Sequence, residues 1–342
     1  VFQGATTYPC IIRIAKSAPR ASFEVTQVKT LDFRDLGEYI REDHYSLNQS
    51  ELDDKGWSLA DERTAALLAK IRSRGVPLGE YVGGKIYNGI KTGLNEAFVI
   101  DSDVKKQLIY EDPMSAEVIK PFLIGKDIKR YFPPKSNNYL IYIPWHFPLQ
   151  NNQEIVSASS VAEAQFEKKY PAIFNHMLKF KPKLAKRDKA ETNIKYEWYA
   201  LQRPRPDYYN EFKKPKIIIP TIVRRASYTY DRTGIYSNDK TSIIPTDDLY
   251  LLGILGSQVA DIVIHSISST KQGGYFEYKP MYVSQIPIRT IDFSDPADIA
   301  RHDRMVSLVE RMLDLHKQLP EAATPHEKTA LERQIKATDG QI

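Results

Sequence analysis

The chain has 342 residues, with 48 Lys and Arg against 43 Asp and Glu, so its net charge is only +5. Its mean hydropathy of −0.44 and the lack of any apolar run of about 18 residues indicate no transmembrane helix. Cys10 is the only cysteine, which excludes intrachain disulfides and cysteine-based zinc sites and leads us to expect a cytoplasmic protein.

The first part of the chain predicts little regular structure. Residues 6–15 include the apolar run Cys10-Ile11-Ile12, which predicts a short buried strand. We expect residues 1–30 to be the end of one domain and residues 31–74 to be a connector. Within that connector, alanine and leucine recur at helical spacing over residues 60–72 and predict an amphipathic helix.

The middle of the chain mixes strand and helix patterns. Residues 139–144 and 216–223 are dense in β-branched and aromatic residues, and residues 242–245 are a shorter run of the same kind, so all three predict strands. Residues 160–169 and 249–266 have helical spacing. The mixture predicts an α/β (α+β) unit with a mixed sheet over residues 75–290.

The last residues predict a pair of antiparallel helices over 291–342. Asp295 followed by Pro296 is a typical helix start, and Thr324-Pro325-His326-Glu327 forms a capping box with proline at the first helical position. Apolar residues recur at helical spacing after each start. We expect a spacer or short coiled-coil arm whose second helix continues to Ile342 without a cap.

The strongest functional signal is the segment from Lys168 to Arg232. Its 65 residues contain 17 Lys and Arg against 6 Asp and Glu, a local charge of +11, together with 11 Phe, Tyr and Trp. Cations neutralise phosphates and aromatic rings stack on bases, so the combination predicts a nucleic-acid surface. The alternative is a solvated basic face over ordinary core aromatics.

Three glycine-containing loops carry further donors suited to phosphates or base edges. Glycine lets a backbone turn sharply and approach a ligand closely. The candidate DNA-binding residues in these loops are Lys85, Lys91, Thr92 and Asn95 in the first, Lys126, Lys129 and Arg130 in the second, and Lys271 and Gln272 in the third.

The basic segment supplies the remaining DNA-binding candidates. We expect phosphate contacts from Lys181, Lys183, Lys186, Arg187, Lys189, Arg224 and Arg225. Base edges should be read by Arg203 and Arg205 at guanine and by Gln202 or Asn95 at adenine. Tyr208, Tyr209 and Trp198 are expected to pack in the core or a hinge.

Catalytic motifs are absent from the sequence. It contains no G-x-G-x-x-G, P-loop, G-x-S-x-G or H-E-x-x-H pattern, and its seven histidines are scattered. We therefore assign no catalytic residue and no metal site.

The order of these segments resembles the C-terminal specificity region of type IIG restriction–modification enzymes, the TaqI-like target-recognition domain of adenine-specific DNA methyltransferases. The blocks that carry the resemblance are VFQGATTYPCII (1–12), GIKTGLNEAFVID (89–101), FLIGKDIKRYF (122–132), LLGILGSQVADIVI (251–264), GGYFEYKPMYVSQIPI (273–288) and the helical segment 311–342. In this family, residues 1–12 would be the last strand of a methyltransferase domain.

The resemblance implies that the fragment binds double-stranded DNA and positions an adenine for a methyltransferase domain of the same parent chain. The family's S-adenosylmethionine and catalytic motifs do not occur in this sequence, so we expect no catalysis and no cofactor in the fragment. S-adenosylmethionine, and Mg²⁺ if a nuclease is present, are expected for the parent. A phage-exclusion (BREX-type) methyltransferase, an RNA-binding module and an interaction scaffold remain as alternatives.

Overall fold

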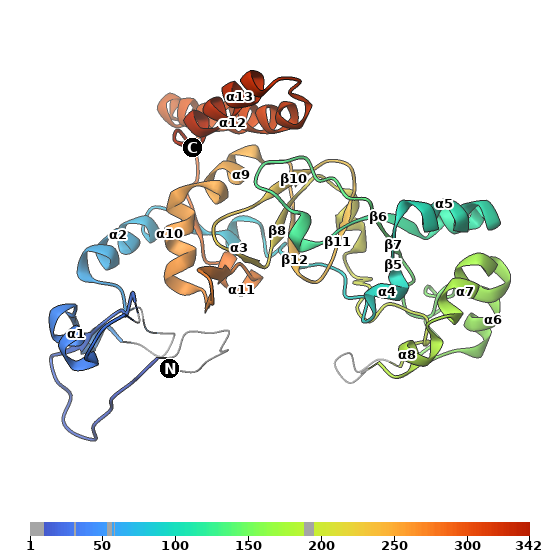
Figure 1. Ribbon diagram of the computed structural model, residues 1–342, viewed down its shortest axis with the longest axis horizontal. Helices are drawn as coiled ribbons and strands as arrows, with labels where there is room; N and C mark the ends of the chain where they lie inside the picture. The colour runs from blue at the N-terminus through green and yellow to red at the C-terminus, as the bar shows by residue number, and fades with distance from the viewer. Residues whose placement is uncertain (1–9, 31, 53–56, 58, 188–194) are drawn as a thin grey trace.

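The computed structural model describes residues 10–30, 32–52, 57, 59–187 and 195–342. Figure 1 shows a small N-terminal unit, a central body, a helical side formed by α5 to α8, and a pair of C-terminal helices above α9. The fold class predicted from the sequence, mixed α/β followed by a helical pair, is confirmed.

The strands of the described residues form five small sheets. These are β1 (Ser22–Val25) with β2 (Tyr45–Asn48); β10 (Thr229–Asp231), β8 (Lys216–Pro220), β12 (Thr241–Pro245) and β4 (Tyr87–Asn88); β11 (Tyr236–Ser237), β6 (Ile119–Leu123), β7 (Asn138–Ile141) and β5 (Val99–Ile100); β13 (Thr270–Lys271), β14 (Tyr275–Glu277) and β9 (Ile222–Val223); and β15 (Pro287–Ile288) with β3 (Val76–Pro77). The pairing of β11 with β6 is parallel and the others are antiparallel, so the predicted mixed sheet is present.

Helices lie beside these sheets (Figure 1). They are α1 (Leu36–Glu42), α2 (Glu62–Arg72), α3 (Leu78–Tyr81), α4 (Asn95–Phe98), α5 (Ser102–Glu111), α6 (Ser160–Lys169), α7 (Pro171–Leu178), α8 (Lys181–Ala185), α9 (Leu249–Gly256), α10 (Gln258–Ile267), α11 (Pro280–Val283), α12 (Pro296–Gln318) and α13 (Pro325–Asp339). The helices expected over 60–72 and 160–169 correspond to α2 and α6.

The prediction of a strand over residues 6–15 is wrong for residues 10–15, the part that the structure describes. Residues 10–15 belong to no strand, and the first strand begins at Ser22. Ile11, Ile12 and Ile14 are 86%, 60% and 81% exposed. An apolar run forms a buried strand only where another layer covers it, and no described residue covers this one.

Two hydrophobic cores lie on opposite faces of the sheet that contains β8. Ile218 and its cross-strand partner Ile243 belong to the core beneath α5 to α8. Ile217 and Ile244, which are also directly opposite each other, belong to the core beneath α9 to α12. A strand buried on both faces has no polar alternation, and this explains the uninterrupted run of isoleucines in β8.

The single helix expected over residues 249–266 is instead two helices. Ser257 separates α9 from α10 and caps α10, its hydroxyl accepting from the Ala260 amide, and the two axes bend by 61°. Serine competes well for this capping position, so it can end one helix and begin the next. Across the described residues, no single helix is long and apolar enough to cross a membrane; the bent pair α9–α10 matches such a span in length and composition alone.

A buried ion pair fixes the edge of the central sheet. The Lys216 ammonium is fully buried and bonds to the Asp231 carboxylate and the Phe212 carbonyl. The same carboxylate accepts from the Thr233 amide at 2.8 Å and the Ile235 amide at 3.0 Å. A buried charge persists only when it is paired and hydrogen-bonded, so this cation of the basic segment serves the fold.

The C-terminal helical pair is docked on the central body. The capping box at Thr324 is present, and α13 ends at Asp339 rather than continuing to Ile342. Against α9, a Cβ at Gly253 would lie 2.6 Å from the Met305 sulfur and 2.9 Å from a Val309 methyl, so only glycine permits α12 to pack this closely. At the far end, Asp339 forms ion pairs with Arg130 and Arg225.

His316 of α12 lies in this docking contact. The residue is 9% exposed, and the centroid of its ring lies 4.5 Å from that of Phe132 and 6.2 Å from that of Tyr131. Burial, followed by the positive charge of Arg130, lowers the pKa of His316 to about 4, and the carboxylate of Asp339 opposes that shift. The folded state therefore holds His316 neutral where the unfolded chain would already be protonated.

We expect the free energy of unfolding to fall as the pH is lowered from 6.5 to 4, by at most about 3 kcal/mol from this group. Below pH 4 both states carry the proton on His316, and the contribution of this group to the pH dependence ends. Urea unfolding across this pH range measures the effect, and His316→Phe should flatten the curve. An unchanged slope in that variant would show that His316 does not carry the dependence.

Candidate nucleic-acid interface

The structure joins two of the segments that the sequence analysis singled out separately. The Lys91 amide donates to the Arg203 carbonyl at 3.2 Å and the Arg203 amide donates to the Lys91 carbonyl at 2.9 Å. The contact continues with the Gln202 backbone amide, which donates to the Thr92 carbonyl at 3.3 Å. The glycine-rich loop and the arginine-rich loop are therefore neighbours, although more than a hundred residues separate them in the sequence.

The turn at residues 237–241 holds the glycine-rich loop in place. The Ile90 amide donates to the Ser237 carbonyl and the Asp239 amide donates to the Ile90 carbonyl, each at 2.9 Å. Gly89 lies so close that a Cβ there would be 1.9 Å from the Asn238 carbonyl oxygen. Any side chain at position 89 would force the two segments apart.

The same turn also holds the second glycine loop. The Gly125 amide donates to the Asn238 side-chain oxygen at 3.2 Å, and a Cβ at Gly125 would be 3.0 Å from the Lys240 carbonyl oxygen. Lys126 and Lys240 are exposed, and within the described residues neither side chain has a hydrogen bond or ion pair. Lys240 was not predicted as a site residue, because a single lysine in an acidic turn gives no charge signal.

A pair of stacked rings supports the arginine-rich loop. Tyr87 and Tyr208 stack with centroids 4.4 Å apart and planes at 19°, and the Tyr208 hydroxyl donates to the Asn88 carbonyl at 3.1 Å. Arg205 has a φ of +59°, which is rare for a side chain of this size, and its Nε lies 3.4 Å from the Gly89 carbonyl oxygen.

Five cations thus surround one turn of the fold. We call Lys91, Lys126, Arg203, Arg205 and Lys240 the central cation group. Hydrogen bonds of Ile90, Lys91, Gly125 and the Arg205 side chain join the segments that carry these cations, so the cations belong to one connected part of the fold rather than to separate loops. Asn95 is exposed at the start of α4 and its side chain accepts from the buried Thr92 hydroxyl at 2.6 Å.

Arg187 has a different role from the phosphate contact expected of it. Its guanidinium donates to the carbonyls of Thr92, Trp198 and Ala200 at 2.7–2.8 Å, and burial lowers its pKa. A Cβ at Gly93 would lie 3.0 Å from the Arg187 side chain. Arg187 therefore fastens the glycine-rich loop to the segment before the arginine-rich loop. Lys189, the neighbouring candidate, lies outside the described residues.

Arg130 and Arg225 are also engaged within the fold. The Arg130 side chain is 18% exposed, pairs with Asp339 and donates to the Gly256 carbonyl at 2.6 Å. Arg225 pairs with Asp339 at 3.2 Å and keeps 57% of its side chain exposed. Arg130 therefore holds α13 against the body, and it does not have the role in DNA binding that we expected from the sequence.

The lysines in α8 and directly after it differ in whether they form ion pairs. Lys181 pairs with Glu163 at 3.2 Å and lies over the Trp198 ring at 4.7 Å, while Lys183 pairs with Glu96 at 2.7 Å. Both are surface pairs that water screens, so their ammonium groups remain accessible. Lys186 is exposed and has no side-chain partner among the described residues.

The remaining predicted residues lie on turns around the body. Lys85 is exposed after Gly83 and Gly84, which have φ values of +58° and +75°. Lys129 is exposed over the Phe132 ring at 5.7 Å. In the sheet β13-β14-β9, Arg224 lies over the Tyr275 ring, Lys271 pairs with Glu277, and Gln272 is exposed.

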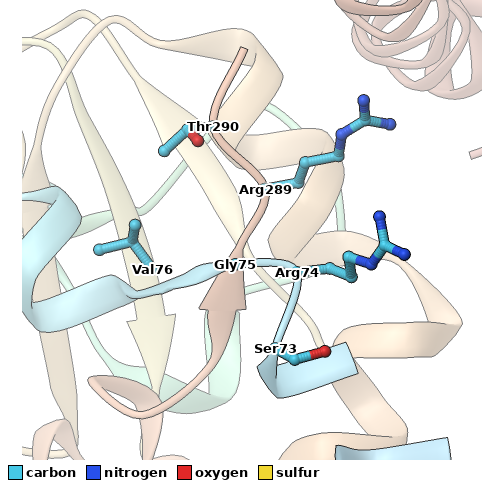
Figure 2. Close-up of a pocket in the computed structure, with 6 residues that line it drawn as sticks. All are labelled: Ser73, Arg74, Gly75, Val76, Arg289 and Thr290. Carbon is cyan, nitrogen blue, oxygen red and sulfur yellow. The ribbon is translucent and has the colours of Figure 1, made fainter. Parts of the chain in front are cut away.

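Two more arginines border a hollow that the sequence did not indicate. Arg74 and Gly75 come just before β3, and Arg289 comes just after β15. Figure 2 shows that the side chains of Arg74 and Arg289 extend to the same side. The hollow has a volume of about 650 Å³, and an apolar groove of about 390 Å³ between α2 and α10 adjoins it. Within the described residues, no group of three His, Cys, Asp or Glu is placed to hold a metal ion.

Residues 120–288 match the family model of the TaqI-like C-terminal specificity domain. The chain is 26% identical to the type II restriction enzyme and methyltransferase RM.Eco57I of Escherichia coli over 369 aligned positions, which cover 98% of this chain and 35% of that protein. It is 28% identical to the type II methyltransferase M.MjaIV of Methanocaldococcus jannaschii over 179 positions, which cover 51% of this chain and 54% of the relative.

Among solved structures, the chain is similar to the type IIL restriction–modification enzyme MmeI in complex with DNA. The TM-score is 0.51 at 13% sequence identity, covering 75% of this chain and 32% of MmeI, which shows a shared fold. The chain thus spans about a third of RM.Eco57I and about half of M.MjaIV. The resemblance to restriction–modification enzymes and their methyltransferases is confirmed.

The position of Arg187 leads to a stability test. Arg187→Met should lower the free energy of unfolding by about 1.5–3 kcal/mol, because three partly buried backbone carbonyls lose a charged donor. The matched control is Lys186→Met, which removes an exposed cation from the preceding residue and should leave stability unchanged. Urea unfolding measures both; equal effects would mean that Arg187 does not act as a fastener.

Proposed function

Because the chain carries a TaqI-like C-terminal specificity domain at residues 120–288, we propose that it binds duplex DNA and recognises a short target sequence. The observation that carries this proposal is the central cation group. Its members come from four segments of the chain, and hydrogen bonds bring these segments together around one turn. A nucleic-acid surface requires cations held in a defined register, since phosphate contacts set the register and base contacts set the sequence.

The members of the group divide by their surroundings. Lys126 and Lys240 are exposed on flexible stems and suit phosphate oxygens, which need charge but little geometry. Arg203 and Arg205 are half-buried. The Arg203 backbone bonds to Lys91 and the Arg205 Nε lies 3.4 Å from the Gly89 carbonyl oxygen, and limited freedom of this kind suits the two-bond contact of a guanidinium with guanine. Lys85, Lys186, Arg224, Lys271 and Gln272 lie on other turns and strand ends of the described chain and would extend the contact along the duplex.

The parent protein is proposed to be a cytoplasmic, adenine-specific DNA methyltransferase in which this chain positions the target. The curated relatives are named as methyltransferases, and one is also named as a restriction enzyme. S-adenosylmethionine would bind to the methyltransferase domain of the parent, which would act on an adenine turned out of the duplex. This chain would contribute recognition and no reacting group.

The salt dependence of DNA binding tests the proposal. Replacing Lys126 or Lys240 with Ala should reduce the slope of log affinity against log salt by about 0.9 for each phosphate that is no longer neutralised. Lys328→Ala, which removes an exposed lysine of α13, serves as the matched control and should leave the slope unchanged. Fluorescence anisotropy with a labelled duplex provides the measurement.

Two results would contradict the proposal. The first is a wild-type chain that binds duplex DNA no better at low salt than at high salt. The second is a set of Lys126, Lys240 and Lys328 variants that share the same slope, which would place the phosphate contacts elsewhere.

A further inference from the structure

The sheet β13-β14-β9 presents an exposed aromatic ring between two cations. Lys271 lies directly opposite Tyr275 in the antiparallel register. Phe276 and Glu277 lie opposite Val223 and Ile222, so the next position places Arg224 opposite Tyr275. Residues directly opposite in an antiparallel pair share one face, and we call Lys271, Tyr275 and Arg224 the Tyr275 row.

The contacts confirm which face the Tyr275 row occupies. The Arg224 guanidinium lies 4.9 Å from the centre of the Tyr275 ring. Phe276, which points the opposite way, stacks on His265 of α10 with ring centroids 3.7 Å apart and planes at 11°. The Phe276 face is therefore packed against the body, while the Tyr275 face is open to solvent.

The exposed face is apolar and positively charged at once. Tyr275 is 37% exposed and Ile222 is 48% exposed. Glu277 pairs with Lys271 at 3.2 Å and with Lys279 at 2.9 Å, and these cations hold the pKa of Glu277 below its usual value against the effect of burial. This region therefore contains the carboxylate of Glu277 and three cations, those of Lys271, Lys279 and Arg224, so its net charge is positive.

The turn that joins β13 to β14 adds no bulk to this face. Gly273 and Gly274 have φ values of +82° and +76°, and a Cβ at Gly274 would meet nothing within 4 Å. The hairpin tip is therefore narrow, and a Cβ at Gly273 would lie 3.5 Å from atoms of the Tyr275 ring, so the turn itself places no side chain against the ring.

We propose that Tyr275 stacks on an unpaired nucleobase while Arg224 and Lys271 neutralise the flanking phosphates. Bases in an intact duplex stack on one another, so a protein ring at the surface gains a stacking partner only where a base has left the helix. An aromatic ring beside cations is the arrangement that binds such bases, and it tolerates any base because each has a π face. This inference rests on the proposed DNA-binding function and adds a residue and a binding mode to it.

Binding of a duplex with one bulged 2-aminopurine, compared with the fully paired duplex, tests the inference. Wild-type protein should prefer the bulged duplex and quench its fluorescence. Tyr275→Ala should lose that preference by about 5- to 100-fold, as expected for the loss of one stacked base, and should not quench. Tyr275→Phe keeps the ring and should behave as wild type, whereas Tyr275→Leu keeps only an apolar side chain and should behave as Tyr275→Ala.

Tyr110→Ala is the matched control, since this tyrosine of α5 is 91% exposed and lies outside the row. If Tyr275→Ala and Tyr110→Ala both bind and quench as wild type, the inference is overturned and the proposed function stands. If wild-type protein binds neither duplex, both the proposed function and the inference are contradicted. Equal binding of the two duplexes by wild type overturns the inference alone.

Discussion

The arrangement of the candidate site depends on one close backbone approach. Residue 89 passes the turn at 237–241 at a distance that leaves no room for a side chain, since a Cβ would lie 1.9 Å from the Asn238 carbonyl oxygen. That approach lets Ile90 bond to both sides of the turn, and Lys91 then meets Arg203 one residue later. Without it, the cations of the glycine-rich loop and of the basic segment would belong to separate surfaces.

Charge alone does not define the functional surface of this chain. Some cations serve the fold: Lys216 in a buried ion pair, Arg187 in a bridge between loops, and Arg130 in the docking of α13. Others remain exposed with their ammonium groups accessible, as Lys126 and Lys240 do. The two kinds differ in burial and in acceptors rather than in sequence context, and the second kind can exchange water for phosphate at low cost.

How well the sequence predicts an element depends on whether local or long-range interactions form it. The isoleucine run of β8 and the capping box of α13 are local signals. Both elements begin where the sequence predicts them, at Lys216 and Pro325, although each ends earlier than predicted. The strand expected over residues 6–15 and the roles of Arg187 and Arg130 depend on contacts with distant segments, which no local pattern encodes. Lys240 was missed for the same reason, because its importance comes from two glycines that approach its turn from elsewhere.

The most direct test of a single cation-bearing surface is lysine acetylation of the native chain with and without duplex DNA, read by mass spectrometry. DNA should protect Lys126 and Lys240 together, although they are far apart in sequence. Lys317 and Lys328 of the helical pair should react at the same rate in both samples. Protection confined to the helical pair, or none at Lys126 and Lys240, would contradict the account.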